Sequence, residues 1–169
     1  MILIDRNQIQ QRVIELAKEI DNSRDLTHPL TVISILNGSI VFTADLIRQL
    51  NGYIYLDSIK ASSYKGTTST GVLAINNLNH IDNIENTDIL LVDDILDTGL
   101  TLHNITNVIS NMKPRSLKTC VLLDKKECRK VPFEATFVGF SIPNNFVVGY
   151  GLDHNGLYRN RPDIHTLNS

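Results

Sequence analysis

The feature that most constrains the fold is a unit that occurs twice: an apolar, β-branched run, a glycine turn, and a stretch with helical spacing. "LTVISIL" ends at the Asn-Gly-Ser turn of residues 37–39, and "IVFTADLIRQL" follows with apolar residues three or four positions apart. "DILLVDD" leads through a turn containing Gly99 into a helical stretch from Leu100 to about Asn111, and then to the run "LKTCVLLD". Two such units predict an α/β protein whose central, mainly parallel sheet is covered by helices on both faces.

The remaining segments complete a single domain. Apolar residues between Asn7 and Ile20 recur at helical spacing, which predicts an amphipathic first helix. The segment 62–75, "SSYKGTTSTGVLAI", is typical of a long surface loop, either a plain connector or a lid over a site. The last third has short strand-like pieces and no long helical pattern, so we expect a small cap there. No linker interrupts the chain, and we expect residues 1–169 to form one domain.

Composition excludes several classes of protein. The formal net charge of -2 offers no attraction for nucleic acid, so we expect no such partner. No apolar run approaches the roughly 18 residues of a membrane span, so we expect no membrane segment. Cys120 and Cys128 lack C-x-x-C spacing, which indicates a reducing, cytoplasmic location. The five histidines lack ligand-like spacing, which disfavours zinc, whereas magnesium, bound by oxygen and substrate phosphates, suits the chain.

Three acids lie close together in "ILLVDDILDTGLTL", residues 89–102. A solvated acidic turn would be the simplest interpretation, but it does not explain why Asp93 and Asp94 directly follow four apolar residues. In parallel sheets, ligands bind at the carboxyl ends of the strands. Ionised carboxylates accept hydrogen bonds, so this pair can bind vicinal hydroxyls of a sugar. Asp97 lies close enough in sequence to take a proton near the anomeric carbon of that sugar.

The turn after these acids is suited to a phosphate. A glycine between a strand and a helix exposes backbone N–H groups, which form an anion nest together with the helix N-terminus. Thr98, Gly99 and Thr101 have the residue types for this. The chain has no G-x-x-x-x-G-K-[ST] motif for a nucleoside triphosphate and no G-x-G-x-x-G motif for a dinucleotide, while a receiver domain would not need the Thr-Gly-x-Thr turn. These residues therefore favour a sugar phosphate as ligand.

The same stretch resembles a known family. "LLVDDILDTGLTL" is similar to the phosphoribosyl-diphosphate-binding signature of type I phosphoribosyltransferases. Further segments resemble the hypoxanthine-guanine branch, in the family's order from Leu36 to Arg159: "ILNGSIVFTADL", the Ser-Tyr of "ASSYKG", "LLDKK", "FVGFSIP", and "FVVGYGLD" followed by "YR". The resemblance implies a parallel sheet with a small hood. It also implies a purine salvage enzyme that transfers 5-phosphoribosyl from phosphoribosyl diphosphate to hypoxanthine or guanine, giving IMP or GMP and diphosphate.

The resemblance implies roles for the acids and the turn. Asp97 would be the general base near purine N7, and Asp93 and Asp94 would bind the ribose hydroxyls, with Mg²⁺ linking the sugar and the diphosphate. Asp153 would face a second Mg²⁺ through water. The residues implied for the 5′-phosphate are Thr98, Gly99, Leu100 and Thr101.

The resemblance implies three further groups. The diphosphate would be bound by Arg159 and by a loop that has an unusual cis peptide in the family, namely Leu36, Asn37, Gly38 and Ser39. The mobile loop that closes over the reacting centre would contribute Ser63 and Tyr64. The purine pocket would contain Lys125, Phe146, Val147 and Asp153. Without the resemblance, simpler interpretations of three of these residues are a solvated lysine pair, a core aromatic and a surface arginine.

The chain departs from the family pattern at three positions. Asp93 stands where this branch commonly has Glu, Asn37 where Lys or Arg is usual, and His154 where Tyr is frequent. We expect His154 to have a surface or stacking role.

Two alternative functions stay open: a non-enzymatic sensor that keeps the fold, and an enzyme of the same superfamily acting on another base. We expect a homodimer or homotetramer, as is common for small metabolic enzymes.

Overall fold

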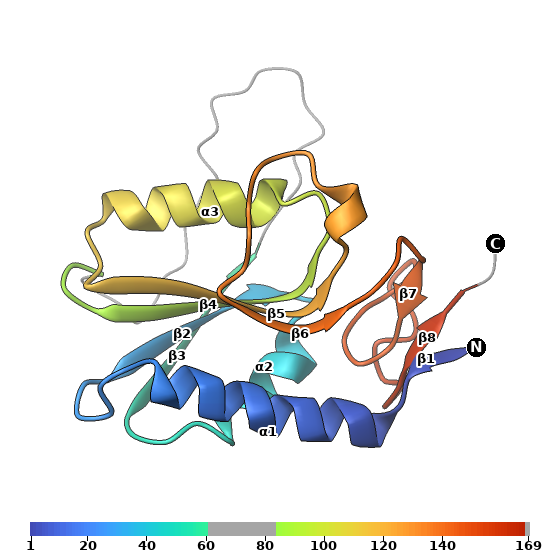
Figure 1. Cartoon of the computed structure of the whole chain (residues 1–169), viewed down its shortest axis with the longest axis horizontal. Coiled ribbons are helices and arrows are strands. Elements are labelled where there is room, and N and C mark those ends of the chain that lie inside the picture. Colours follow the sequence, from blue (N-terminus) through green and yellow to red (C-terminus); the bar gives the residue numbers. More distant parts are fainter. Residues whose placement is uncertain (61–83, 168–169) are drawn as a thin grey trace.

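A computed structural model describes residues 1–60 and 84–167 of the chain. Its centre is a five-stranded sheet in the order β3-β2-β4-β5-β6, and every pairing in it is parallel (Figure 1). The strands of this sheet are β2 (Leu30–Leu36), β3 (Ile54–Lys60), β4 (Asp88–Leu96), β5 (Ser116–Asp124) and β6 (Phe137–Ser141). The predicted α/β class with a mainly parallel sheet is therefore confirmed.

Helices cover both faces of the sheet, as the two strand–turn–helix units predicted. Figure 1 shows α1 (Arg6–Asn22) and α2 (Ile40–Ile47) on one side and α3 (Leu100–Asn111) on the other. Each side has its own cluster of buried apolar residues. Helix α1 extends beyond the predicted stretch at both ends, and Asp5 caps its start, accepting hydrogen bonds from the N–H groups of Asn7 and Gln8. A short 3₁₀ helix, η1 (Lys126–Cys128), follows β5.

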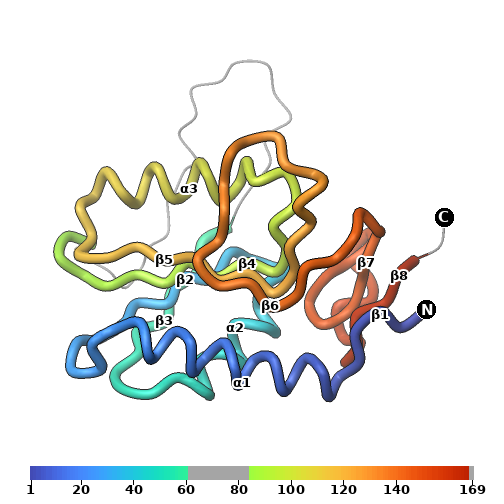
Figure 2. The backbone as a smooth tube through the Cα atoms, viewed as in Figure 1, coloured from blue at the N-terminus to red at the C-terminus, as the bar shows by residue number. Residues whose placement is uncertain are grey.

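The two chain ends form a second, small sheet. Strands β1 (Ile2–Ile4), β7 (Val147–Val148) and β8 (Ile164–Thr166) pair antiparallel in the order β1-β8-β7. Figure 2 shows the blue start of the chain beside its red end. This sheet is the small cap that the last third of the sequence predicted, and β1 at the start of the chain completes it.

Two strands differ from the sequence prediction. Strand β4 runs to Leu96 instead of ending at Asp94, because Ile95 and Leu96 continue the pairing with β5. Strand β3 was not predicted, and its "IYLDSIK" pairs in register with β2 at the edge of the described sheet. In the described part of the chain, no helix combines the length and the apolar character needed to cross a membrane.

Candidate active site

The sequence-predicted residues gather at the carboxyl ends of β2 and β4. A cavity of about 280 Å³ lies there, between the end of β2, the last residues of β4 and the first turn of α3. Its lining includes the acids of β4, the turn before α3, and Leu36 and Gly38 after β2. Parallel pairing explains this convergence, because it brings the ends of neighbouring strands to one edge of the sheet.

Asp93 and Asp94 lie in β4 and not after it, and Asp93 is buried while Asp94 is partly buried. Asp93 is 7% exposed, and its carboxylate accepts the N–H of Asp94 at 3.0 Å. Burial raises the pKa of Asp93 well above its usual range, and the neighbouring charge of Asp94 raises it further. Burial also raises the pKa of Asp94, although the positive charge of Arg159 opposes this. Within the described residues neither carboxylate forms an ion pair, and Arg159 pairs with Asp153 instead.

Magnesium fits this acidic pair. Within residues 1–60 and 84–167, no three His, Cys, Asp or Glu side chains gather as a ready-made metal site. Mg²⁺ is bound through one or two carboxylates together with substrate phosphates, so two neighbouring acids without an ion-pair partner among the described residues suffice for it. Asp153 has other partners, because Arg159 lies 2.7 Å from its carboxylate and the N–H of Gly156 donates to it.

The turn before α3 is open to an anion. Gly99 is the N-cap of the helix and has a left-handed φ of 83°, a conformation that glycine adopts without strain. The N-cap residue makes no side-chain hydrogen bond, and the N–H of Leu100 donates to Thr98 Oγ1 only at 3.4 Å, so the backbone N–H groups of the first turn keep their capacity to bind a phosphate. Val131 lies against Gly99 from the far side, where an added Cβ would be 3.1 Å from its Cγ2 atom.

The loop after β2 packs directly on the acidic pair. The peptide bond between Leu36 and Asn37 is cis, as the resemblance implied. A Cβ at Gly38 would collide with the carboxylate of Asp94, and a Cβ at Gly151 would collide with the carbonyl of Gly38. Ser39 is fully buried. Two glycines therefore allow three segments, far apart in sequence, to meet around the Asp94 carboxylate.

Lys125 is buried beside Asp97. Its ammonium lies 4.0 Å from the Asp97 carboxylate, and the two side chains are 8% and 47% exposed, respectively. A solvated lysine pair is therefore the wrong interpretation of Lys125, whereas the adjacent Lys126 is exposed. Sequence reasoning missed Cys128, which lies near Asp97. Partial burial and the neighbouring Asp97 carboxylate raise the pKa of Cys128, which keeps the thiol protonated.

The cap residues face the same end of the sheet. Phe146 is 53% exposed, so it is no core aromatic, and its ring meets the edge of His154 at 5.2 Å between centroids. His154 is exposed, as the expected surface role requires, and its ring contacts Phe146 edge-on at 85° and does not stack on it. Val147 is buried in β7. Arg159 donates to the carbonyl of Gly151 at 2.6 Å, which places its charge near the Gly38 loop and Asp94.

Two predicted residues, Ser63 and Tyr64, lie outside the described residues. The predicted residues that line the cavity are Leu36, Gly38, Asp93, Asp94, Asp97, Thr98, Gly99 and Thr101. Lys125 lies beside Asp97, whereas Asn37, Ser39, Leu100 and Arg159 are not part of the lining. The individual roles of these residues stay predictions.

A parallel α/β sheet with a helix that begins at a glycine, two acids at the end of a strand and a lysine beside a third acid is typical of proteins that bind sugar phosphates. The family described as "Phosphoribosyl transferase domain" matches residues 3–155 of this chain. The chain belongs to this family and is a phosphoribosyltransferase enzyme.

Relatives cover nearly the whole chain. The hypoxanthine-guanine phosphoribosyltransferase of Aquifex aeolicus is 46% identical over 168 residues, which are 98% of this chain and 93% of that protein. The enzyme of the same name from Bacillus subtilis is 41% identical, with 98% and 92% covered. A crystal structure of a hypoxanthine-guanine phosphoribosyltransferase from Bacillus anthracis has a TM-score of 0.89 and 43% identity, with 99% and 98% covered. The family and fold implied by the sequence are confirmed.

Proposed function

We propose that this enzyme transfers the 5-phosphoribosyl group of phosphoribosyl diphosphate to hypoxanthine or guanine, giving IMP or GMP and diphosphate. The observation that carries the proposal is the pairing of Asp97 with the buried Lys125, 4.0 Å apart, next to the turn that begins α3. This arrangement places a proton acceptor and a hydrogen-bond donor for a base beside a phosphate site. The names of the relatives support the same substrates.

Different protein groups bind the sugar phosphate and the purine base. The first turn of α3 holds the 5′-phosphate, and Asp93 and Asp94 accept hydrogen bonds from the ribose hydroxyls. Asp97 takes the proton from N7 of the purine as N9 bonds to the anomeric carbon and diphosphate leaves. Lys125 donates to the 6-oxo group, and the exposed ring of Phe146 stacks on the purine.

The leaving group is held on the other side of the acids. The backbone of the 36–39 loop and the charge of Arg159 are placed to bind the diphosphate, since both lie next to Asp94. When bound, Mg²⁺ would supply positive charge to the sugar and diphosphate oxygens, and Asp93 and Asp94 are the residues that would hold it. Asp153 would face a second Mg²⁺ through water.

We also propose that the chain acts as one domain and assembles with further copies of itself into a homodimer or homotetramer. Large apolar side chains are exposed on α2 and β3: Ile40, Tyr55 and Leu56 are 53%, 63% and 50% exposed. A groove of about 590 Å³ runs between these elements and includes Leu36, which also lines the active-site cavity. A second copy covering this face would bury the apolar groove. Two free thiols support a cytoplasmic location.

A diphosphate-release assay tests the proposed substrates. Phosphoribosyl diphosphate and Mg²⁺ are supplied with hypoxanthine, guanine, xanthine or adenine in separate reactions. We expect release with hypoxanthine or guanine, and at least about tenfold lower kcat/KM with adenine, because its 6-amino group presents donors to the Lys125 ammonium. Release with adenine alone would indicate a different branch of the family. No release with any of the four bases would contradict the proposed substrates.

A further inference from the structure

Arg129 binds the backbone of the candidate site from behind. Its side chain is 14% exposed and follows η1 in sequence. Its Nη1 atom donates to the carbonyls of Leu96 and Asp97 at 2.8 and 2.6 Å and lies 3.3 Å from the carbonyl of Lys125. Its Nε atom donates to the carbonyl of Phe133 at 3.1 Å. One guanidinium group therefore connects the ends of β4 and β5 with the segment that leads to β6.

The two residues that face each other in the site share this anchor. Asp97 and Lys125 belong to different strand ends, and their side chains meet at 4.0 Å. Their carbonyl oxygens both lie within hydrogen-bonding distance of Arg129 Nη1. The guanidinium thus sets the separation of the two backbones, and that separation determines where the carboxylate and the ammonium lie relative to a base.

A buried acid holds Arg129 in place. Asp124 is 0% exposed, and one of its carboxylate oxygens accepts a hydrogen bond from Nη2 of Arg129. Its other oxygen has no hydrogen-bond partner among the described residues. A buried carboxylate needs a cation close to it, so Asp124 and Arg129 each fix the position of the other.

The arginine also supports the phosphate turn. A Cβ added at Gly99 would lie 3.5 Å from Cδ of Arg129. The N–H of Lys130 donates to the carbonyl of Thr98 at 2.9 Å. The segment that carries Arg129 therefore packs directly on the turn that presents the backbone N–H groups of α3.

We propose that Arg129 is a positioning residue that fixes the phosphate turn, Asp97 and Lys125 relative to one another without touching substrate. The role in turnover rests on the proposed function. A planar guanidinium with five N–H donors can bind several carbonyls and a carboxylate at once, whereas a lysine ammonium has three donors and no fixed plane. Loss of Arg129 therefore loosens the sugar-phosphate and purine sites together, and Arg129→Lys restores only part of the geometry.

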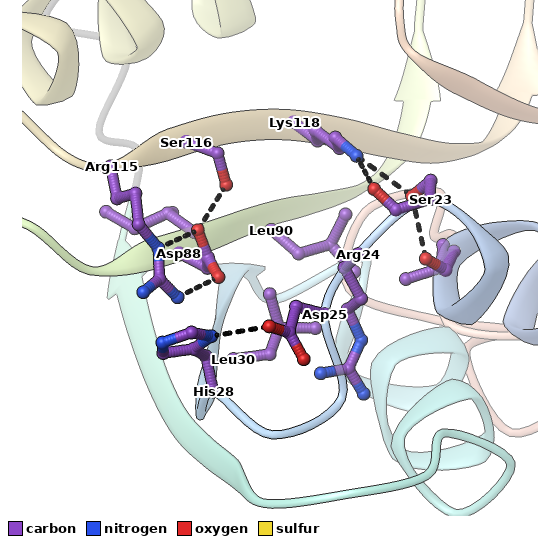
Figure 3. Close-up of a pocket in the computed structure, with 12 residues that line it drawn as sticks. Ser23, Arg24, Asp25, His28, Leu30, Asp88, Leu90, Arg115, Ser116 and Lys118 are labelled. Atoms are coloured by element: carbon purple, nitrogen blue, oxygen red, sulfur yellow. Dashed lines mark hydrogen bonds and ion pairs between the residues drawn. The ribbon is translucent and has the colours of Figure 1, made fainter.

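A second arginine provides a matched control. Arg115 binds Asp88 through Nε at 2.9 Å and through Nη2, and Ser116 donates to the same carboxylate at 2.7 Å. Figure 3 shows this group at the starts of β4 and β5, the strands whose other ends Arg129 joins. Arg115→Met removes an arginine–aspartate pair from the same two strands without altering the candidate site.

The experiment compares Arg129→Met, Arg129→Lys and Arg115→Met in the full chain. We expect Arg129→Met to lower kcat/KM for both phosphoribosyl diphosphate and hypoxanthine by about 100-fold, because displacing reacting groups by about 1 Å has effects of that size. Arg129→Lys should lose about tenfold, since it keeps the charge and some donors. Calorimetric titration with ribose 5-phosphate alone should show weaker binding to Arg129→Met than to Arg115→Met. Thermal melting identifies any variant that fails to fold.

Three outcomes would overturn the inference: kcat/KM of Arg129→Met within about twofold of wild type, an equal loss in Arg115→Met at matched stability, or full recovery in Arg129→Lys. If Arg129→Met does not fold, Arg129→Lys decides, because it keeps the charge beside Asp124. If the wild type transfers nothing to hypoxanthine or guanine, the proposed function fails, while the ribose 5-phosphate titrations still test the role of Arg129 at the turn. A wild type that does not bind ribose 5-phosphate overturns both.

Discussion

The acids at the two ends of the sheet differ in whether they have basic partners. At the amino ends, Figure 3 shows acids facing bases: Asp88 binds Arg115, and the ring of His28 lies 3.1 Å from the carboxylate of Asp25. The hydrogen bond from Arg115 lowers the pKa of Asp88. At the carboxyl ends, Asp93 is buried without an ion pair among the described residues, and its pKa is raised. Strand β4 contains both acids. Asp88 at its start stabilises the fold through its ion pair, whereas Asp93 near its end has no ion-pair partner among the described residues and can bind a ligand.

This difference gives the two ends opposite pH dependences. Asp88 has a lowered pKa in the folded state, so its contribution to stability is present above the unfolded carboxyl pKa of about 3.9 and is lost as pH falls through the folded pKa. Asp93 has a raised pKa, so the folded protein holds its proton more tightly than the unfolded chain. Its ionisation therefore reduces stability as pH rises from about 3.9 to the raised pKa. A bound cation at the carboxyl end would remove this penalty.

The largest effect that would separate the two ends is expected for Asp97→Asn. The change keeps the shape of the side chain but removes the proton acceptor, so kcat with hypoxanthine should fall by roughly 10²- to 10⁴-fold. The dissociation constant of phosphoribosyl diphosphate should change little. Asp25→Asn, at the amino ends, is the control and should keep kcat near wild type. Turnover of Asp97→Asn within a few-fold of wild type would mean that Asp97 is not the base.

Lys125→Ala tests the purine side of the site. We expect kcat/KM for hypoxanthine and guanine to fall about tenfold or more, because a buried 6-oxo acceptor loses its charged donor. Adenine has no 6-oxo group to accept from Lys125, so the ratio of kcat/KM for hypoxanthine or guanine to kcat/KM for adenine should decrease. Steady-state kinetics with the three bases measure this, with Lys118→Ala at the amino end of β5 as the control. An unchanged preference would remove Lys125 from the purine pocket.

Asparagine substitutions of Asp93 and Asp88 should shift stability in opposite directions. Asp93→Asn removes an unmatched buried charge and should raise the melting temperature at pH 7 by about 2–4 °C, while KM for phosphoribosyl diphosphate increases. Asp88→Asn leaves Arg115 without its carboxylate and should lower the melting temperature by roughly 2–6 °C with kcat unchanged. Calorimetric melts of both variants check this. If both substitutions changed the melting temperature in the same direction, the proposed difference between a stabilising Asp88 and a destabilising Asp93 would be wrong.

The smallest expected effect is a release of protons on ligand binding. Phosphoribosyl diphosphate with Mg²⁺ brings positive charge to Asp93 and Asp94, which favours their ionised forms, so binding should release up to about one proton where the pair is partly protonated. Calorimetry in buffers of different ionisation enthalpy measures this number. Asp93→Asn should reduce the release, and Asp88→Asn should leave it unchanged. Proton uptake by the wild type would contradict the raised pKa values.

Local patterns in the sequence determined the layout of the fold. The periods of the apolar residues predicted β2, β5 and the helices, because one strand or helix carries its own repeating pattern. The acids and Gly99 marked the phosphate turn, since a helix N-terminus after a strand is encoded by adjacent residues. The order of short motifs was enough to indicate the family. These features need no knowledge of which segments meet in space.

Only the tertiary structure decided which distant groups became partners. Arg129 and Cys128 lie in an ordinary charged segment, yet Arg129 donates to the carbonyl of Asp97, and the Asp97 carboxylate raises the pKa of Cys128. Burial of Asp93 depends on β4 continuing past the acids to Leu96, which pairing with β5 imposes. Hydrogen bonds and burial of this kind arise between segments that are separate in the sequence. Their strength depends on distance and desolvation in the folded chain, which leave no repeating pattern in the order of residues.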